Sequence, residues 1–198
     1  MTRLILASGS AARARMLRDA GVPFEVIQPD VDEDAVKNTF GQTLADAERI
    51  AAVLARRKAL SIKGFGPEVV VLGSDQVLAS DDGLFDKPRS LADAKSQLRV
   101  LRGKTHRLIS SATLVKNGAV VWSGTDIVSL AMRPFSDVFL DEYIAAFGDL
   151  VLTSVGGYHI EGLGAQLFER IDGDLFSVQG LPLLQVLGAL RKLGILTK

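Results

Sequence analysis

Short apolar runs and helical patterns alternate along the first half of the chain. Strands are predicted at residues 4–6, 24–28 and 69–72. The run VVVL at 69–72 contains no polar residue, which is typical of a strand that is buried on both faces. Residues 10–21 and 43–63 instead carry the apolar spacing of a helix. The first half is therefore predicted to run strand, helix, strand, helix, strand.

Two long predicted strands dominate the second half. They cover residues 105–115 and 119–132, and Asn117 and Gly118 between them are a strong hairpin signal. His106, at the start of the first of them, is interpreted as a hydrogen-bonding loop residue and not as a ligand. The remaining elements are helices over 90–101, over 136–147 and after Pro182, and a strand near 167–171.

Cap residues support the helix assignments. Ser10 is the expected N-cap of the first helix, and Gly21 is its expected end. Thr43 and Asp46 have the spacing of a capping box. Ser136 is expected to cap the helix that Gly148 closes, and Ser90 with Asp93 resembles a further cap.

The run VVVL stops at Gly73, and the polar stretch with Asp75 follows at once. A carboxylate at the end of a buried strand costs free energy unless a cation or a proton partner meets it. A turn at residues 80–83 is expected to bring Lys87 back near Asp75. An acid beside a lysine suits a bound metal and a phosphate chain, and the alternative is a surface hairpin with an incidental ion pair.

A small-residue turn at 7–10 leads from the first strand into a helix, which is a common geometry for binding anions. Arg13 and Arg15 lie near the start of this helix, where a cation opposes the helix dipole unless an anion is bound. The alternative is a solvated helix face. The turn is not a P-loop, because the pattern GxxxxGK[ST] is absent.

Two further stretches carry candidate polar residues. The acidic segment 30–34 is predicted to be a loop, in which solvation is favoured for the three aspartates and Glu33 is left open as a Mg²⁺ ligand. The glycine-rich segment 156–164 is predicted to let the backbone approach a flat ligand, with Glu161 as its candidate recognition residue. The alternative for Glu161 is an exposed loop acid.

Composition narrows the class of protein. The chain has 198 residues, enough for one domain or two small lobes, and 23 basic residues balance 23 acidic ones. This balance argues against a dedicated nucleic-acid surface. The absence of cysteine excludes disulfides and thiolate metal sites. No segment has the character of a signal peptide or a membrane span, so we expect a soluble intracellular protein without a membrane partner.

Six motifs together resemble the Maf family of nucleoside triphosphate pyrophosphatases over almost the whole chain. They are LASGSxxR at 6–13, GSDQ at 73–76, DKP at 86–88, GKTH at 103–106, GGYxxEGLG at 156–164 and GLPL at 180–183. The resemblance implies an α/β fold with a mixed sheet, in which residues 1–198 form a single domain of two lobes around a central cleft, similar in shape to the inosine triphosphatase fold. It also implies a cytoplasmic homodimer.

The same resemblance implies a reaction and a set of site residues. The reaction is hydrolysis of a nucleoside triphosphate between its α- and β-phosphates, with Mg²⁺ or Mn²⁺. Asp75 matches the position of the proton acceptor, and Asp75 and Glu33 match metal positions. The matching phosphate-binding positions are Ser8, Ser10, Arg13, Lys58 and Lys87.

Three positions distinguish the branches of the family, and here they hold Ala12, Gln76 and Glu161. Gln76 and Glu161 resemble the branch that acts on 7-methyl-GTP. A carboxylate can accept both hydrogen-bond donors of a guanine edge. Ala12 departs from the Trp or Arg of both branches, so an aromatic platform is missing. The alternatives are a dTTP/UTP pyrophosphatase of the same fold and a non-catalytic nucleotide-binding regulator of septum formation.

Overall fold

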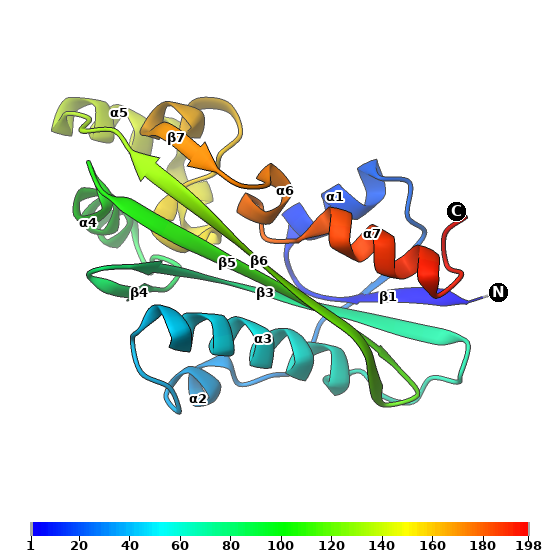
Figure 1. Ribbon diagram of the computed structural model, residues 1–198. Helices are drawn as coiled ribbons and strands as arrows, with labels where there is room; N and C mark the ends of the chain where they lie inside the picture. Colours follow the sequence, from blue (N-terminus) through cyan, green and yellow to red (C-terminus); the bar gives the residue numbers. More distant parts are fainter. Residues whose placement is uncertain (1, 198) are drawn as a thin grey trace.

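The computed structural model describes residues 2–197 (Figure 1). The strands are β1 (Arg3–Ala7), β2 (Glu25–Ile27), β3 (Val69–Ser80), β4 (Gly83–Phe85), β5 (Thr105–Lys116), β6 (Ala119–Met132) and β7 (Phe168–Asp172). The helices are α1 (Ala11–Asp19), α2 (Glu33–Lys37), α3 (Leu44–Ser61), α4 (Leu91–Leu101), α5 (Asp137–Phe147), α6 (Leu175–Val178) and α7 (Leu183–Lys192). Three 3₁₀ turns follow α5, namely η1 (Gly148–Thr153), η2 (Val155–Gly157) and η3 (Gly162–Leu167).

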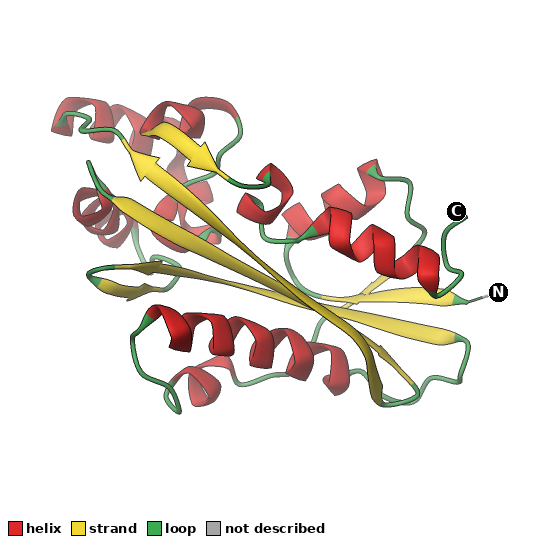
Figure 2. Ribbon diagram, in the orientation of Figure 1, coloured by secondary structure: helices red, strands yellow, loops and turns green. Residues whose placement is uncertain are grey.

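One mixed sheet organises these elements. Its strand order is β2-β1-β3-β5-β6-β7, and β4 pairs with β3 off this path. β1 runs parallel to β2 and β3, whereas the remaining pairs are antiparallel. The long strands β3, β5 and β6 extend through the whole molecule (Figure 2). The predicted α/β class with a mixed sheet is confirmed.

Helices cover both faces of the sheet. Figure 1 shows α3 and α2 on one face, with α1 and α7 at one end of the other face and α4 and α5 at its other end. Val70 and Leu72 of β3 join the core beneath α1 and α7, whereas Val69 and Val71 belong to a core on the opposite side with Ala59 of α3. The run VVVL is therefore buried on both faces, as its apolar character predicts.

Local sequence signals define where helices and turns begin. The Ser10 side chain accepts a hydrogen bond from the Arg13 backbone N–H at 3.4 Å. Thr43 and Asp46 form the predicted capping box. Asn117 and Gly118 have φ angles of 51° and 72°, which are the positive values that the hairpin turn requires.

Gly73 sets how closely α3 lies on the sheet. A Cβ atom at Gly73 would lie 2.2 Å from the carbonyl oxygen of Ala55 and 2.5 Å from the backbone nitrogen of Ala59. The sheet-facing side of α3 is lined by fully buried alanines, namely Ala47, Ala51, Ala55 and Ala59. At Gly73, therefore, no side chain separates the backbones of α3 and β3, and they are in direct contact.

Three local predictions were wrong. β3 does not end at Gly73 but continues to Ser80, because its pairing with β5, which runs from residue 70 to residue 79, includes the polar residues after Gly73. Glu33 does not lie in a loop but begins α2, since Asp32 caps that helix. His106 is not a loop residue: it lies within β5 and is 1% exposed.

A search of residues 2–197 finds no helix with both the length and the apolar character needed to cross a bilayer.

Candidate active site

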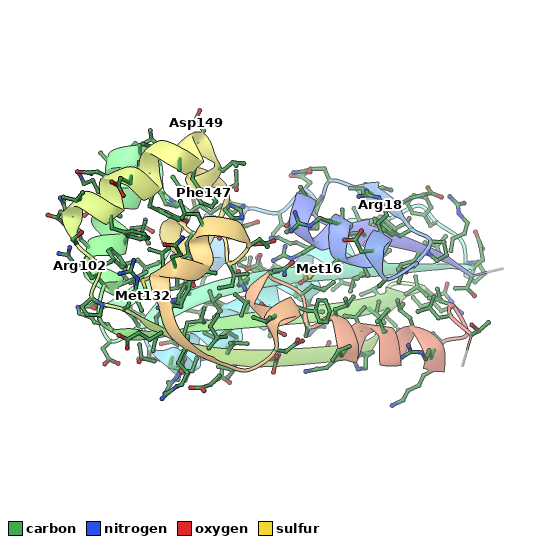
Figure 3. The ribbon with its side chains drawn as sticks, turned by 90° about the horizontal axis from the view of Figure 1, so that it is seen from above. Met16, Arg18, Arg102, Met132, Phe147 and Asp149 are labelled. Atoms are coloured by element: carbon green, nitrogen blue, oxygen red, sulfur yellow. The ribbon has the colours of Figure 1, made fainter. Side chains whose placement is uncertain are left out.

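A cavity of about 1040 Å³ opens beside the middle of β3. Its walls come from the β1–α1 turn, the segment from β2 into α2, the β4–α4 connection, the loop from η1 to Glu161, and residues 178–180. In the view from above, α1 with Met16 and α5 with Phe147 lie at opposite ends of the same face (Figure 3). All ten residues named as site candidates line this cavity: Ser8, Ser10, Ala12, Arg13, Glu33, Lys58, Asp75, Gln76, Lys87 and Glu161.

Lys58 joins the two candidate carboxylates. Its ammonium lies 2.5 Å from Oδ1 of Asp75 and 2.6 Å from Oε1 of Glu33. The side chains of Lys58 and Asp75 are each 8% exposed, and that of Glu33 is 43% exposed. Lys58 lies on α3 between Ala55 and Ala59, so the contact of these alanines with Gly73 brings its ammonium to β3. Three elements thus converge on one charge cluster.

The environment of Asp75 changes the affinity of its carboxylate for a proton. Burial raises the pKa of the Asp75 carboxyl, and the charges of Lys58 and Arg13 oppose that rise. For Glu33, burial also acts to raise the pKa, but Lys58, Lys37 and Lys87 together lower it. Of the two acids, Asp75 is therefore the stronger base.

Arg13 forms the wall beside the β1–α1 turn. It is 8% exposed, and its Nε donates to the carbonyl oxygen of Gly180 at 2.7 Å while Nη1 donates to Oγ of Ser8 at 3.2 Å. The same carbonyl of Gly180 accepts from the Ser74 hydroxyl at 3.2 Å. These contacts fix the guanidinium at the start of α1, and its remaining N–H groups are available to an anion.

Lys87 lines the cavity but is not the direct partner of Asp75. The ammonium that contacts Asp75 belongs to Lys58, which corrects the expectation that the β3–β4 turn would pair Asp75 with Lys87. The charges of this cluster nevertheless affect Lys87. Burial and the charge of Arg13 lower the pKa of Lys87, and the charges of Glu33 and Asp75 oppose that change. It adds a further cation to the same space.

Sequence reasoning missed several charged residues of the cavity. Lys37 of α2 lies 2.6 Å from Asp86, and both line the cavity with Arg89 and Asp34. Asp86 is part of the DKP motif. Lys37 was missed because residues 30–34 were assigned to a loop, so the helix that carries Lys37 was not predicted. The lining residues now include five cations, Arg13, Lys37, Lys58, Lys87 and Arg89, and five acids, Glu33, Asp34, Asp75, Asp86 and Glu161.

The amide nitrogen of Gln76 is bonded within the protein. Its Nε2 donates to Oγ of Ser110 at 3.0 Å, to the carbonyl oxygen of Ser177 at 2.9 Å and to that of Val178 at 3.1 Å. Because three acceptors surround the nitrogen, the amide orientation is fixed and only Oε1 remains for a ligand. Gln76 therefore offers an acceptor and not a donor.

Glu161 lies at the N-cap of η3 and forms an ion pair with Arg15 of α1. The side chains of Arg15 and Glu161 are 52% and 41% exposed. The sequence left two interpretations of Arg15, a cation on a solvated helix face and a functional residue. The structure adds that Arg15 has a specific partner, Glu161. The ion pair links two walls of the cavity that are 146 residues apart in sequence.

Gly156, in the glycine-rich stretch before Glu161, is required for packing. A Cβ atom at Gly156 would lie 2.6 Å from Cδ1 of Leu78 and 2.9 Å from the ring of Tyr158. Gly156 also has a φ of 76°, which disfavours other residues. The expectation that these glycines clear space for a flat ligand is therefore wrong at Gly156, which lets the loop pack on β3.

A buried hydrogen bond supports this loop from behind. The hydroxyl of Tyr158, which lines the cavity, lies 2.6 Å from Nε2 of His106. Burial lowers the pKa of His106 to about 4, so the imidazole is neutral at physiological pH. The GKTH and GGY motifs contain these residues, but nothing in the sequence signals that they meet.

The carboxylate oxygens near Asp75 are suited to a metal cation whose other ligands come from the substrate. Within residues 2–197 no three or more His, Cys, Asp or Glu side chains form a metal-binding group. Glu33 and Asp75 do converge on a single positive charge, that of Lys58. Two carboxylates completed by phosphate oxygens are a usual arrangement for Mg²⁺.

Comparisons with known proteins agree on one family. A family model described as Maf-like protein matches residues 3–193. A nucleoside triphosphate pyrophosphatase of Paramagnetospirillum magneticum is 46% identical over 190 residues, covering 96% of this chain and 98% of the relative. A 7-methyl-GTP pyrophosphatase of Rhizobium etli is 43% identical over 192 residues, covering 97% and 96%.

A solved structure described as a nucleoside-triphosphatase / dITP/XTP pyrophosphatase of Mycobacterium abscessus aligns with 99% of this chain and 98% of its own. It is 14% identical, with a TM-score of 0.42. At this TM-score the likeness supports no conclusion about this chain.

Proposed function

Because the chain belongs to the Maf family, we propose that it is a nucleoside triphosphate pyrophosphatase whose preferred substrate is 7-methyl-GTP. As a hydrolase acting on an acid anhydride, it converts a nucleoside triphosphate into the monophosphate and pyrophosphate. The observation that carries the site assignment is the buried Asp75, held by Lys58 in a cavity that all ten candidate residues line.

Asp75 accepts the proton of the attacking water in this proposal. Its raised pKa makes the carboxylate a better base than an exposed aspartate, and the charges of Lys58 and Arg13, which oppose the rise in pKa, favour the ionised form. Water attacks the α-phosphorus, the bond to the bridging oxygen of the β-phosphate breaks, and pyrophosphate leaves. Asp75 holds the proton taken from the water.

Cations of the cavity receive the phosphates. Arg13, Lys58 and Lys87 stabilise the charge that develops on the phosphate oxygens. Since five acidic residues offset the five cationic ones that line the cavity, the protein alone brings little net positive charge to a triphosphate. Glu33 and Asp75 would hold a divalent metal, Mg²⁺ or Mn²⁺, which supplies the missing positive charge when bound.

The base preference rests on the acceptors that the cavity offers. Gln76 presents Oε1 because its nitrogen is bonded within the protein, and Glu161 presents carboxylate oxygens. A guanine edge offers two adjacent donors, whereas a uracil or thymine edge places one donor between two acceptors. Methylation at N7 adds positive charge to the ring, which further favours an anionic partner.

A nucleotide panel tests the proposal. Purified protein with Mg²⁺ is incubated with 7-methyl-GTP, GTP, UTP and dTTP, and pyrophosphate release is measured. We expect release from 7-methyl-GTP with the highest kcat/KM. The highest kcat/KM on UTP or dTTP would instead identify a pyrimidine-nucleotide enzyme, and tight binding without any turnover would favour the non-catalytic regulator.

We infer from the family resemblance that the enzyme acts as a cytoplasmic homodimer. The sedimentation coefficient of the purified protein distinguishes a dimer from a monomer, and microscopy of the fluorescently tagged protein tests the location.

A further inference from the structure

The ion pair between Arg15 and Glu161 is not explained by the proposed reaction. Arg15 reaches from α1 to the loop that carries Glu161 and contacts Oε1 of its carboxylate. A cation in the first half of a helix is opposed by the helix dipole, and α1 has no acidic residue in its first turn to compensate. The partner of Arg15 therefore comes from the other wall of the cavity.

The contact leaves part of Glu161 free. Only Oε1 is engaged by Arg15, so Oε2 remains available as an acceptor. Glu161 lines the cavity, whereas Arg15 is not one of its lining residues. Arg15 is thus suited to act on a ligand through Glu161 and not by touching it.

We propose that Arg15 is a specificity-determining residue that acts through Glu161: it holds one carboxylate oxygen, leaves the other to the base, and partly offsets the carboxylate charge. This inference rests on the proposed function, in which Glu161 reads the base. A positive charge beside the base site repels a cationic ring but not a neutral one. Arg15 therefore lowers the preference of the site for 7-methylguanine over guanine and keeps neutral purines acceptable.

The effect is set by the exposure of the pair. Half-exposed ion pairs are screened by water and salt, so their influence is modest. Removing the charge of Arg15 should increase the ratio of kcat/KM for 7-methyl-GTP to that for GTP by about two- to fivefold. The change should decrease as the salt concentration is raised, because the Debye length falls to about 8 Å near physiological ionic strength.

The test compares Arg15→Gln with a matched control on the same helix. Arg18 is an exposed arginine of α1 that lies at the end of the helix away from α5 (Figure 3), so Arg18→Gln removes the same charge outside the cavity. Arg15→Lys keeps the charge and should retain the wild-type ratio. Both substrates are measured in competition, and KM and kcat are also determined separately.

In Arg15→Gln we expect a lower KM for 7-methyl-GTP, a KM for GTP that changes less, and little change in kcat for either substrate. A merely structural role of Arg15 would affect both substrates equally. An unchanged or lower ratio in Arg15→Gln, or the same shift in Arg18→Gln, overturns the proposal.

Binding provides a readout that is independent of turnover. The dissociation constants of 7-methyl-GMP and GMP are measured by calorimetry for the wild type and Arg15→Gln, and their ratio should shift in the same direction. If the wild type binds both monophosphates and the ratio shifts, but no triphosphate is hydrolysed, the proposed function fails while the role of Arg15 stands. If the wild type binds neither monophosphate, or the ratio does not move, the role of Arg15 is refuted.

Discussion

Replacing Lys58 by methionine tests whether this lysine holds the charge cluster together. Methionine keeps much of the apolar stem and removes the ammonium that contacts Asp75 and Glu33. Removing one partner of a buried ion pair costs about 3–5 kcal/mol. Asp75 can take up a proton in response, and Glu33 is half-exposed, so the lower end applies. We expect the free energy of unfolding to fall by about 3 kcal/mol.

A double-mutant cycle separates the ion pair from lost packing. In Asp75→Asn the carboxylate is already absent, so adding Lys58→Met should cost less by about 2 kcal/mol, within the range measured for residues in contact. Urea unfolding is followed by the fluorescence of Trp122, the single tryptophan of the chain. Arg56→Met, at an exposed position of the same helix, is the control and should change stability by less than about 0.5 kcal/mol.

Two outcomes would refute this reasoning. A loss below about 1 kcal/mol in Lys58→Met would mean that the pair is not buried in solution as the structure has it. If the stability losses of the two single variants add up to that of the double variant within about 0.5 kcal/mol, Lys58 and Asp75 do not interact, even if each variant is unstable.

Three further predictions address chemistry, base choice and pH. Asp75→Asn should lower turnover on 7-methyl-GTP by about 10²-fold or more in a pyrophosphate-release assay while the circular dichroism spectrum is unchanged, and a rate near that of the wild type would remove Asp75 as the proton acceptor. Glu161→Gln should shift relative kcat/KM from guanine toward pyrimidine nucleotides by about 1–3 kcal/mol, and the same preference order in both proteins would show that Glu161 does not read the base. His106 has its folded-state pKa lowered from 6.5 to about 4, so its contribution to stability is fully present above pH 6.5 and is lost as the pH falls toward 4, up to about 3 kcal/mol. His106→Gln should lack this loss in urea titrations between pH 7 and pH 4, so equal slopes of stability against pH in the two proteins would contradict the buried, neutral imidazole.

Elements with local signals were predictable from the sequence. The caps at Ser10 and Thr43 and the turn at Asn117 depend on residues within four positions of one another, and each formed as expected. The length of β3 was not predictable in this way. Its polar residues Ser74 and Gln76 interrupt the apolar run, but their side chains are satisfied by partners on β5 and near Gly180. Such partners lie 34 or more residues away.

The site shows the same division. The six motifs contain eight of the ten candidates that line the cavity, and Glu33 and Lys58 were named only from the family resemblance. Which candidate residues contact one another depends on how the helices and strands pack, and no motif encodes this packing. Lys58 contacts Asp75 only because α3 lies against Gly73, and Arg15 meets Glu161 only because α1 and the loop before η3 face one another.

The contact between Gly73 and the alanines of α3 also bears on how the two walls of the cavity can move. Glycine and alanine have no side-chain torsion that could adopt a second arrangement, so the close contact at Gly73 leaves little room for α3 to shift on β3. We therefore expect the wall that carries Lys58 and Asp75 to move less than the opposite wall, where the loop at 153–161 is joined to α1 by the half-exposed pair of Arg15 and Glu161. In the proposed site, the more rigid wall is the one that receives the phosphates, and the more mobile wall is the one that receives the base.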